Sequence, residues 1–419
     1  MKVTNFRIAP SPLEGIGAYA PSVPAAQPTL PGRRIRIAVI GIRGVPCHYS
    51  GPERACEALF AILAERGHHI SIYCRPEHHE QGLEGYRGTR LIATPALRNR
   101  SLETLSHVAS SLVHAILRGH YDVVHFQALA PNLFAPVCRA VGVPTVATVR
   151  GLDWQRAKWK GAGSQVIKLA ERCMVRHVDE IICVSRALQA YYRETYQTET
   201  RYIPNGLTLN TMVAGNDDEK LRQFGLTPKR YIAYIGRLVP EKRIQDLIAA
   251  FRRIDDASLR LAIVGDGRHS AGYSEQLVGL ARGDDRIVFT GLQSGTALAT
   301  LFTCAALYAS CSEVEGLPNA VLESIGYGTP AVLSDIPPHR ELMSSVADYD
   351  LFVPPGDVDR LTERLLTGLA HLARYEAIAP RAREYVSNNY NWSAIADRTE
   401  QIYAELLANK MQSTGHNVA

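Results

Sequence analysis

The chain has 419 residues, of which 46% are hydrophobic and 21% are charged, and its formal net charge is +5. This composition is ordinary for a globular protein of two or three domains, and it excludes a wholly disordered chain or a fibrous rod. No basic stripe interleaved with aromatic residues runs along the chain, so we expect no nucleic-acid partner. The small positive excess suits an anionic substrate or an anionic lipid surface.

The eight cysteines form no CxxC pair and no Cys/His cluster with zinc-ligand spacing. We therefore expect no metal site, buried free thiols and a reducing, cytoplasmic location. The N-terminus lacks the pattern of a secretory signal, and no 18-residue stretch is apolar throughout. These observations predict no membrane span and leave only a peripheral membrane contact.

The predicted elements begin after a proline-rich segment. Residues 1–33 hold six prolines and no apolar periodicity, which predicts a disordered tail. A run rich in β-branched residues at 35–41 predicts a buried parallel strand. Apolar residues at helical spacing between 55 and 63, followed by Gly67, predict a helix with a glycine cap. Residues 70–74 return to strand and complete a βαβ unit.

The alternation then continues in two sets, separated by a turn signal at 204–206. Further strands are predicted at 123–126, 145–149, 180–184 and 201–204, and then at 231–235, 259–264, 286–289, 305–309 and 330–333. Helices are predicted between most of them, including one at 244–254, and a last amphipathic helix follows. Two such sets predict an α/β protein with two doubly wound, Rossmann-like domains.

Ligands of such sheets bind outside the carboxyl ends of the strands, so two facing sheets would share one cleft. The first strand ends in a loop containing Gly41, Gly44 and Pro46, and Ser50 with Gly51 precedes the next helix. Glycines permit close approach of a ligand, and a helix N-terminus favours an anion. A tight strand-to-helix turn explains this segment equally well.

Two segments of the second half carry more specific chemistry. Gly236, Arg237 and Lys242 follow a predicted strand, where the two cations could hold a diphosphate, although a solvated loop is the alternative. Glu315 and Glu323 flank a turn that leads into a helix. Carboxylates accept paired hydrogen bonds from the vicinal hydroxyls of a ribose or hexose, while a Glu near a helix start also suits the helix dipole.

The combination of Arg237 with Lys242, Glu315-x7-Glu323 and the segments 328–330 and 334–335 resembles the retaining glycosyltransferases of family 4, with the GT-B fold. Residues 41–46 and 151–154 look like a bacterial branch that assembles surface polysaccharides or exopolysaccharides. The resemblance covers about residues 34–408. It implies an N-terminal acceptor domain at 34–207, a C-terminal nucleotide-sugar donor domain at 208–392, a helix at 393–410 packing back on the N-terminal domain, and a tail at 411–419.

The resemblance also implies roles for single residues. Arg237 and Lys242 would hold the diphosphate of the donor and stabilise it as it leaves, without a metal or cofactor, and Glu315 would bind the donor sugar. Further donor-binding residues would be Gly236, Gly316, Leu317, Glu323 and Asn205. The acceptor side of the cleft would be formed by Gly44, Ser50, Gly51, Arg150 and Asp153.

Two positions depart from the family pattern. Arg150 stands where the family usually has His, and Ser50 stands where paired glycines are expected beside Gly51. Arginine is longer and always charged, so it could bind a phosphate or a carboxylated sugar. A side chain at position 50 could narrow the approach of the acceptor.

We therefore expect a retaining hexosyltransferase that uses a nucleotide-diphosphate sugar and a glycan or polyprenyl-linked acceptor in bacterial polysaccharide biosynthesis. A sugar-nucleotide epimerase on the same fold and a non-catalytic nucleotide-sugar-binding protein remain alternatives. The basic and aromatic residues at 156–160 predict contact with an anionic membrane at its cytoplasmic face. A solvated loop with a packed Trp accounts for them equally well.

Overall fold

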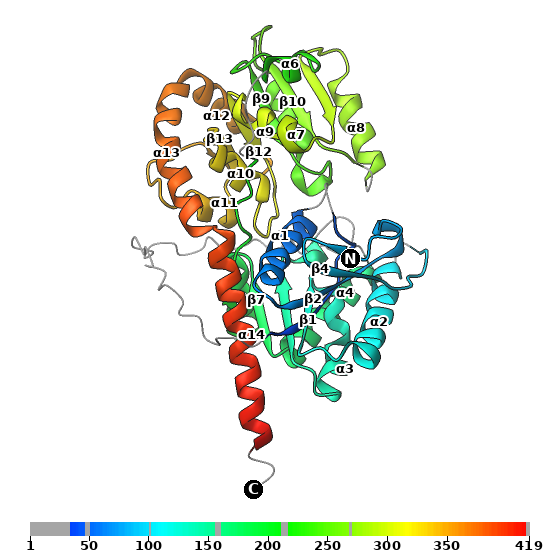
Figure 1. Cartoon of the computed structure of the whole chain (residues 1–419). Coiled ribbons are helices and arrows are strands. Elements are labelled where there is room, and N and C mark those ends of the chain that lie inside the picture. Colours follow the sequence, from blue (N-terminus) through cyan, green and yellow to red (C-terminus); the bar gives the residue numbers. More distant parts are fainter. Residues whose placement is uncertain are drawn as a thin grey trace, which may run out of the picture.

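The structure is a computed structural model that describes residues 34–46, 51–99, 102–155, 161–210, 217–267 and 270–415. The expected tail at 1–33, Ser50 and the basic segment at 156–160 lie outside these residues. Figure 1 shows two α/β halves, with the N-terminal half in blue to green and the C-terminal half in green to orange. The expectation of an α/β protein with two sheets is confirmed.

The N-terminal half is built on a sheet of eight strands in the order β3-β4-β2-β1-β5-β6-β7-β8. Its pairs are parallel except for β3 with β4. The strands are β1 (Arg36–Ile40), β2 (His69–Cys74), β3 (Gly85–Tyr86), β4 (Thr89–Ala93), β5 (Val123–Gln127), β6 (Thr145–Val149), β7 (Glu180–Cys183) and β8 (Arg201–Tyr202). The helices are α1 (Gly51–Glu65), α2 (Glu103–His114), α3 (Ala135–Ala140), α4 (Ala162–His177) and α5 (Arg186–Tyr196), with short turns η1 (Pro76–His78), η2 (Ala115–Gly119), η3 (Ala130–Phe134) and η4 (Asp153–Gln155).

The C-terminal half has a six-stranded parallel sheet in the order β11-β10-β9-β12-β13-β14. Its strands are β9 (Tyr231–Ile235), β10 (Arg260–Val264), β11 (Ile287–Gly291), β12 (Leu307–Ser310), β13 (Ala331–Ser334) and β14 (Phe352–Val353). Its helices are α6 (Asp217–Arg222), η5 (Pro240–Lys242), α7 (Ile244–Phe251), α8 (Ala271–Ala281), α9 (Gly295–Thr303), α10 (Asn319–Tyr327), α11 (Pro337–Leu342), α12 (Val358–Ala370) and α13 (Leu372–Asn389). The central strands β9 and β12 are buried along their whole length, as expected for strands covered on both faces.

The last helix, α14 (Trp392–Gly415), leaves the C-terminal half and runs along the N-terminal half (Figure 1). Ile395, Ile402 and Tyr403 join the core cluster that contains β1, β2 and α1. The Tyr403 hydroxyl lies 2.6 Å from Nδ1 of the buried His125 on β5. The chain therefore crosses between the halves a second time, and its end is part of the N-terminal core.

Some boundaries and strands differ from the sequence-based expectation. We placed the end of the last helix at 410, but α14 continues to Gly415. The edge strands β3, β4 and β14 were not expected, and β3 and β14 are only two residues long. In β4, buried and exposed residues are mixed, and this weak alternation over five residues gives little periodicity to detect.

Candidate functional site

The carboxyl ends of the two sheets meet at a cleft that encloses about 1180 Å³ and is open to solvent. Most of the site residues expected from the sequence line it, namely Gly51, Arg150, Asn205, Gly236, Arg237, Lys242, Glu315, Gly316, Leu317 and Glu323. A volume of this size accommodates a ligand larger than a single sugar. The cleft therefore lies where doubly wound folds bind their ligands, at strand ends from both halves.

A buried ion pair forms the centre of the C-terminal wall. Lys242, at the end of η5, donates from Nζ to Oε1 of Glu315, and the two side chains are only 18% and 11% exposed. Burial alone would raise the pKa of Glu315, but the charge of Lys242 outweighs it and the pKa lies below its usual value. Glu315 is therefore an anion at neutral pH and can accept hydrogen bonds from ligand hydroxyls.

Arg237 lies in the loop after β9, beside this pair. The Tyr234 hydroxyl donates to the Arg237 carbonyl at 2.8 Å, and the Leu238 amide donates to the Asp266 carbonyl at 3.0 Å. Gly265, with φ of +146°, lies so close to the Gly236 carbonyl that a Cβ there would collide with it. Two strand-end loops are thus fixed against each other, which places Arg237 and Lys242 on one wall.

Glu323 of α10 lies at another part of the cleft and has a partner from the opposite half. Arg54 of α1 reaches it with an Nη2–Oε1 distance of 3.1 Å, and the Glu323 side chain is 10% exposed. Burial raises the pKa of Glu323, and the charge of Arg54 partly opposes this rise. This ion pair spans the cleft between the two halves.

Backbone contact joins the two walls at Gly316. A Cβ at this position would collide with the carbonyl oxygen of Arg150, so the loop after β12 can approach the end of β6 only with glycine there. Nearby, the Asn205 amide donates to Oδ1 of Asn319 at 2.9 Å, and Asn319 donates to the Gly51 carbonyl at 3.4 Å. The approach of the halves is therefore set by backbone and amide contacts.

The N-terminal wall is organised around Arg150, which follows β6. Its Nε and Nη2 donate to Oε1 of Gln127 at 3.3 and 3.0 Å, Nη1 donates to Oδ1 of Asn205, and Nη2 lies 3.5 Å from the Cys56 sulfur. Burial, and after it the charge of Arg150, lowers the pKa of His125 to about 3, so His125 is neutral at pH 7. The charge on this part of the wall is that of the guanidinium.

Two expected acceptor-side residues do not line the cleft. Gly44 is buried, and a Cβ there would meet the carbonyl of His78. Asp153 begins the short turn η4 and is half-buried outside the lining. Their roles stay predictions, as does that of Ser50, which lies outside the described residues.

Sequence reasoning missed three residues of the site. Arg54 pairs with Glu323, and Gln127 and Cys56 contact Arg150. Arg54 follows the Gly51 turn directly, and this proximity was the available signal. Gln127 ends a buried strand, and Cys56 lies on an apolar helix face. Neither position differs from a core residue when the sequence is considered alone.

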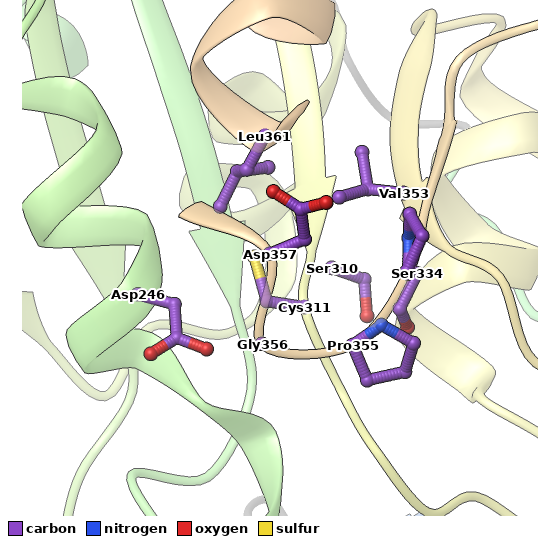
Figure 2. A pocket seen from close by; sticks show the side chains of 10 residues that line it. Asp246, Ser310, Cys311, Ser334, Val353, Pro355, Gly356, Asp357 and Leu361 are labelled. Carbon is purple, nitrogen blue, oxygen red and sulfur yellow. The ribbon is translucent and has the colours of Figure 1, made fainter. Parts of the chain in front are cut away.

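A second, smaller cavity of about 230 Å³ lies behind β12 (Figure 2). Its lining includes Asp246, Ser310, Cys311 and Ser334, and Ser310 also lines the main cleft. Asp246 is already paired with Arg243 at 2.6 Å. The second carboxylate of the lining, Asp357, accepts a hydrogen bond from the Arg360 amide at 2.8 Å, so both carboxylates already have partners within the protein.

No group of three or more His, Cys, Asp or Glu side chains within the described residues is placed to hold a metal ion. No helix within them has both the length and the apolarity needed to cross a membrane.

Family models match both halves of the chain. Residues 49–211 match glycosyltransferase family 4, and residues 229–371 match glycosyl transferases group 1. The α-maltose-1-phosphate synthase of Mycobacterium tuberculosis is 26% identical over 342 residues, which are 74% of this chain and 85% of the synthase. The Escherichia coli UDP-Gal:alpha-D-GlcNAc-diphosphoundecaprenol alpha-1,3-galactosyltransferase is 24% identical over 380 residues, 86% of this chain and 95% of the relative.

Solved structures show the same architecture. Sucrose-phosphate synthase from Thermosynechococcus elongatus superposes with a TM-score of 0.78 at 24% identity, covering 90% of this chain and all of that one. Anabaena HepE in complex with UDP and glucose gives a TM-score of 0.73 at 18% identity, covering 88% and 100%. These likenesses confirm the GT-B fold. The chain, matched over most of its length by the two family models, belongs to the glycosyltransferases of group 1 and family 4.

Proposed function

We propose that the chain is a retaining glycosyltransferase that moves a hexose from a nucleotide-diphosphate sugar to a glycan or polyprenyl-linked acceptor in bacterial polysaccharide biosynthesis. The observation that carries the proposal is the Lys242–Glu315 ion pair beside Arg237 at the strand ends of the C-terminal sheet. It offers cations for a diphosphate and an ionised carboxylate for sugar hydroxyls within one cleft.

In the proposed reaction, the bond between the sugar C1 and the leaving phosphate oxygen breaks, and the acceptor hydroxyl attacks C1 from the same face. The hydroxyl proton passes to the leaving phosphate, and Arg237 and Lys242 stabilise the negative charge that develops there. The rest of the rate enhancement comes from positioning of the two substrates in the closed cleft and from exclusion of water. We propose that these two cations perform the task without a metal ion or other cofactor.

The donor side rests on three further contacts. Glu323 would bind the ribose hydroxyls, the loop containing Gly316 and Leu317 would approach the sugar or phosphate, and Asn205 would lie at the junction of the halves. The E. coli relative carries UDP-Gal and a diphosphoundecaprenol-linked sugar in its name, which supports a nucleotide sugar and a lipid-linked acceptor here. Action at the cytoplasmic face of a membrane is part of the same proposal.

The test measures binding and hydrolysis of a panel of nucleotide sugars, with and without lipid-linked acceptors, for the wild type and Glu315→Ala. We expect slow release of one nucleotide, accelerated by an acceptor and reduced at least about tenfold in the variant, because a charged hydrogen bond to the sugar is lost. Glu313→Ala is the matched control, since this neighbouring carboxylate is 47% exposed and paired with Arg243.

Other outcomes would replace the proposal. Release of an altered donor without an acceptor would identify an epimerase. Tight binding with no turnover in the presence of acceptors would identify a non-catalytic binding protein. Failure to bind any nucleotide sugar or nucleotide diphosphate would overturn the assignment of the cleft.

A further inference from the structure

Arg150 is a cation in the cleft whose partners among the described residues are all neutral. Its hydrogen bonds go to Gln127, Asn205 and the Cys56 sulfur, and it forms no ion pair within the described residues. Removing a guanidinium from water without an anion is unfavourable, so a cleft that retains one is suited to an anionic ligand.

The group around Arg150 also has more hydrogen-bond donors than acceptors. A guanidinium carries five N–H groups, and the contacts of Arg150 use four of them. One N–H on Nη1 and the buried Nε2 amide of Gln127 have no acceptor among the described residues. The Gln127 oxygen accepts from both Arg150 and Cys56, so a flipped amide would set its N–H groups against the guanidinium.

Two other cations of the cleft already have carboxylate partners. Lys242 pairs with Glu315, and Arg54 pairs with Glu323. His125 is within the influence of the Arg150 charge. It is neutral, because burial, and after it this charge, lowers its pKa to about 3. The neutral contacts hold the Arg150 charge in place before a ligand arrives, which is favourable for recognition of an anion.

The position of Arg150 narrows the choice of anion. Its carbonyl lies against Gly316, the residue after Glu315, whereas Arg237 and Lys242 lie on the opposite wall, where we place the diphosphate. The ligand group nearest Arg150 is then part of a sugar. Sugars carry negative charge as phosphate esters or as the carboxylate of a hexuronic acid. The carboxylate, with a single charge, matches the one N–H of Arg150 that lacks an acceptor among the described residues better than a phosphate ester, whose charge approaches about −2.

We propose that Arg150 binds the carboxylate of a hexuronic acid, carried either by the transferred sugar or by the terminal sugar of the acceptor. This inference rests on the proposed function, and it names the class of substrate. The carboxylate would accept a charged hydrogen bond from Nη1, while Gln127 and Asn205 keep the guanidinium in position.

The experiment first identifies by calorimetry which of UDP, GDP, ADP and dTDP binds. In the donor arm, the hexose and hexuronate esters of that nucleotide are compared. In the acceptor arm, the protein saturated with the nucleotide is titrated with disaccharides ending in glucose or glucuronate. Each arm uses the wild type, Arg150→Met, Arg150→Lys and the control Arg253→Met, which removes an exposed charge paired with Asp359.

We expect the wild type and the control to prefer the carboxylate ligand about 10- to 100-fold in one arm, which identifies the source. Arg150→Met should lose this preference and Arg150→Lys should keep part of it, while affinity for the nucleotide alone stays within about twofold in all variants. Unchanged nucleotide affinity also shows that Arg150→Met is folded.

Three results would overturn the inference while leaving the proposed function intact. These are no preference for the carboxylate in either arm, a preference that persists in Arg150→Met, or an equal loss of affinity for the nucleotide alone, which would make Arg150 a diphosphate contact. If no nucleotide binds the wild type, the proposed function fails, and this inference fails with it.

Discussion

The two walls of the cleft differ in the partners that they give to a cationic side chain. On the C-terminal wall, Lys242 has a carboxylate partner in the same half of the chain, so its charge is balanced before a ligand binds. On the N-terminal wall, Arg150 is held by an amide oxygen from β5, another from Asn205 in the segment after β8 and a thiol from α1. The C-terminal wall can exchange its internal pair for ligand contacts, whereas the N-terminal wall presents a fixed positive charge.

The difference shows that a residue can shape the cleft without belonging to a recognisable sequence motif. The C-terminal wall is formed by loops that follow β9 and β12, which are neighbours in the sheet, so each charged residue could be placed from its own strand although Lys242 and Glu315 are 73 positions apart. The N-terminal wall gathers Cys56, Gln127, Arg150 and Asn205 from four separate segments. Substitutions on the two walls should therefore change different quantities.

The largest effect is expected from Lys242→Met on the C-terminal wall. It removes a diphosphate cation and leaves Glu315 buried without its counter-ion, so the pKa of Glu315 should rise. We expect kcat/KM for donor hydrolysis to fall about 10²- to 10³-fold, by analogy with loss of one charge-stabilising group elsewhere. Lys229→Met is the control, because its pair with Glu376 is 3.0 Å long and exposed. Equal loss in both variants, or none in Lys242→Met, would contradict the comparison.

The next effect is expected where the walls touch. In Gly316→Ala the new Cβ meets the Arg150 carbonyl, so the loop must move away and the distance between Glu315 and the N-terminal wall must increase. We expect transfer to fall about 100-fold, as small misplacements of reacting groups do. Gly279→Ala in α8 is the control, since a Cβ there meets open space and should raise the free energy of unfolding by about 0.5–1 kcal/mol. Normal transfer by Gly316→Ala would show that the contact does not set the geometry.

A smaller effect is expected on the pH dependence of nucleotide binding, through the Arg54–Glu323 ion pair that spans the cleft. The pKa of Glu323 is raised by burial, and Arg54 opposes this rise, so Arg54→Met should raise the pKa further. Nucleotide binding that needs the ionised carboxylate is retained at high pH and lost as pH falls through this pKa. The loss in Arg54→Met should therefore begin at a higher pH than in the wild type, which affinity measurements between about pH 5 and 8 can test.

Glu323→Gln serves as the reference for this measurement, because it has no carboxyl group to titrate at that position. Its affinity should be lower but nearly independent of pH in the same range. If Arg54→Met and the wild type lose affinity at the same pH, the ion pair does not influence Glu323 in the working protein.

The smallest effect is expected from the contact between Tyr403 of α14 and His125, and it concerns the free energy of unfolding. Tyr403→Phe removes the hydroxyl that bonds His125 and leaves a buried ring nitrogen without that partner. We expect the free energy of unfolding to fall by about 1–2 kcal/mol, measured with urea. Tyr86→Phe at the sheet edge, where the hydroxyl donates to Glu57 at 3.1 Å, should cost about 0.5 kcal/mol. A larger loss in Tyr86→Phe would argue against α14 as part of the N-terminal core.

Local sequence patterns were sufficient to predict the main strands and helices and the charged residues of one wall of the cleft. The buried strands 35–41 and 231–235 were recognisable because a strand covered on both faces is a continuous apolar run. Arg237, Lys242 and Glu315 were recognisable because charged residues directly after such strands must lie at the sheet edge. The short edge strands β3 and β14 escaped notice, since two residues carry no period.

The amino-acid order thus determined the α/β class, the two sheets and the cations of the C-terminal wall, because these depend on residues near one another along the chain. The partners of Arg150, the pairing of Arg54 with Glu323 and the close contact at Gly316 depended on folding. Each joins segments separated by 23 or more positions, and burial makes a polar Gln127 or a Cys56 indistinguishable from a core residue until its neighbours are in place. The Arg150 charge, which has no carboxylate partner within the part of the chain that the structure describes, is therefore a property of the folded assembly and of no single segment.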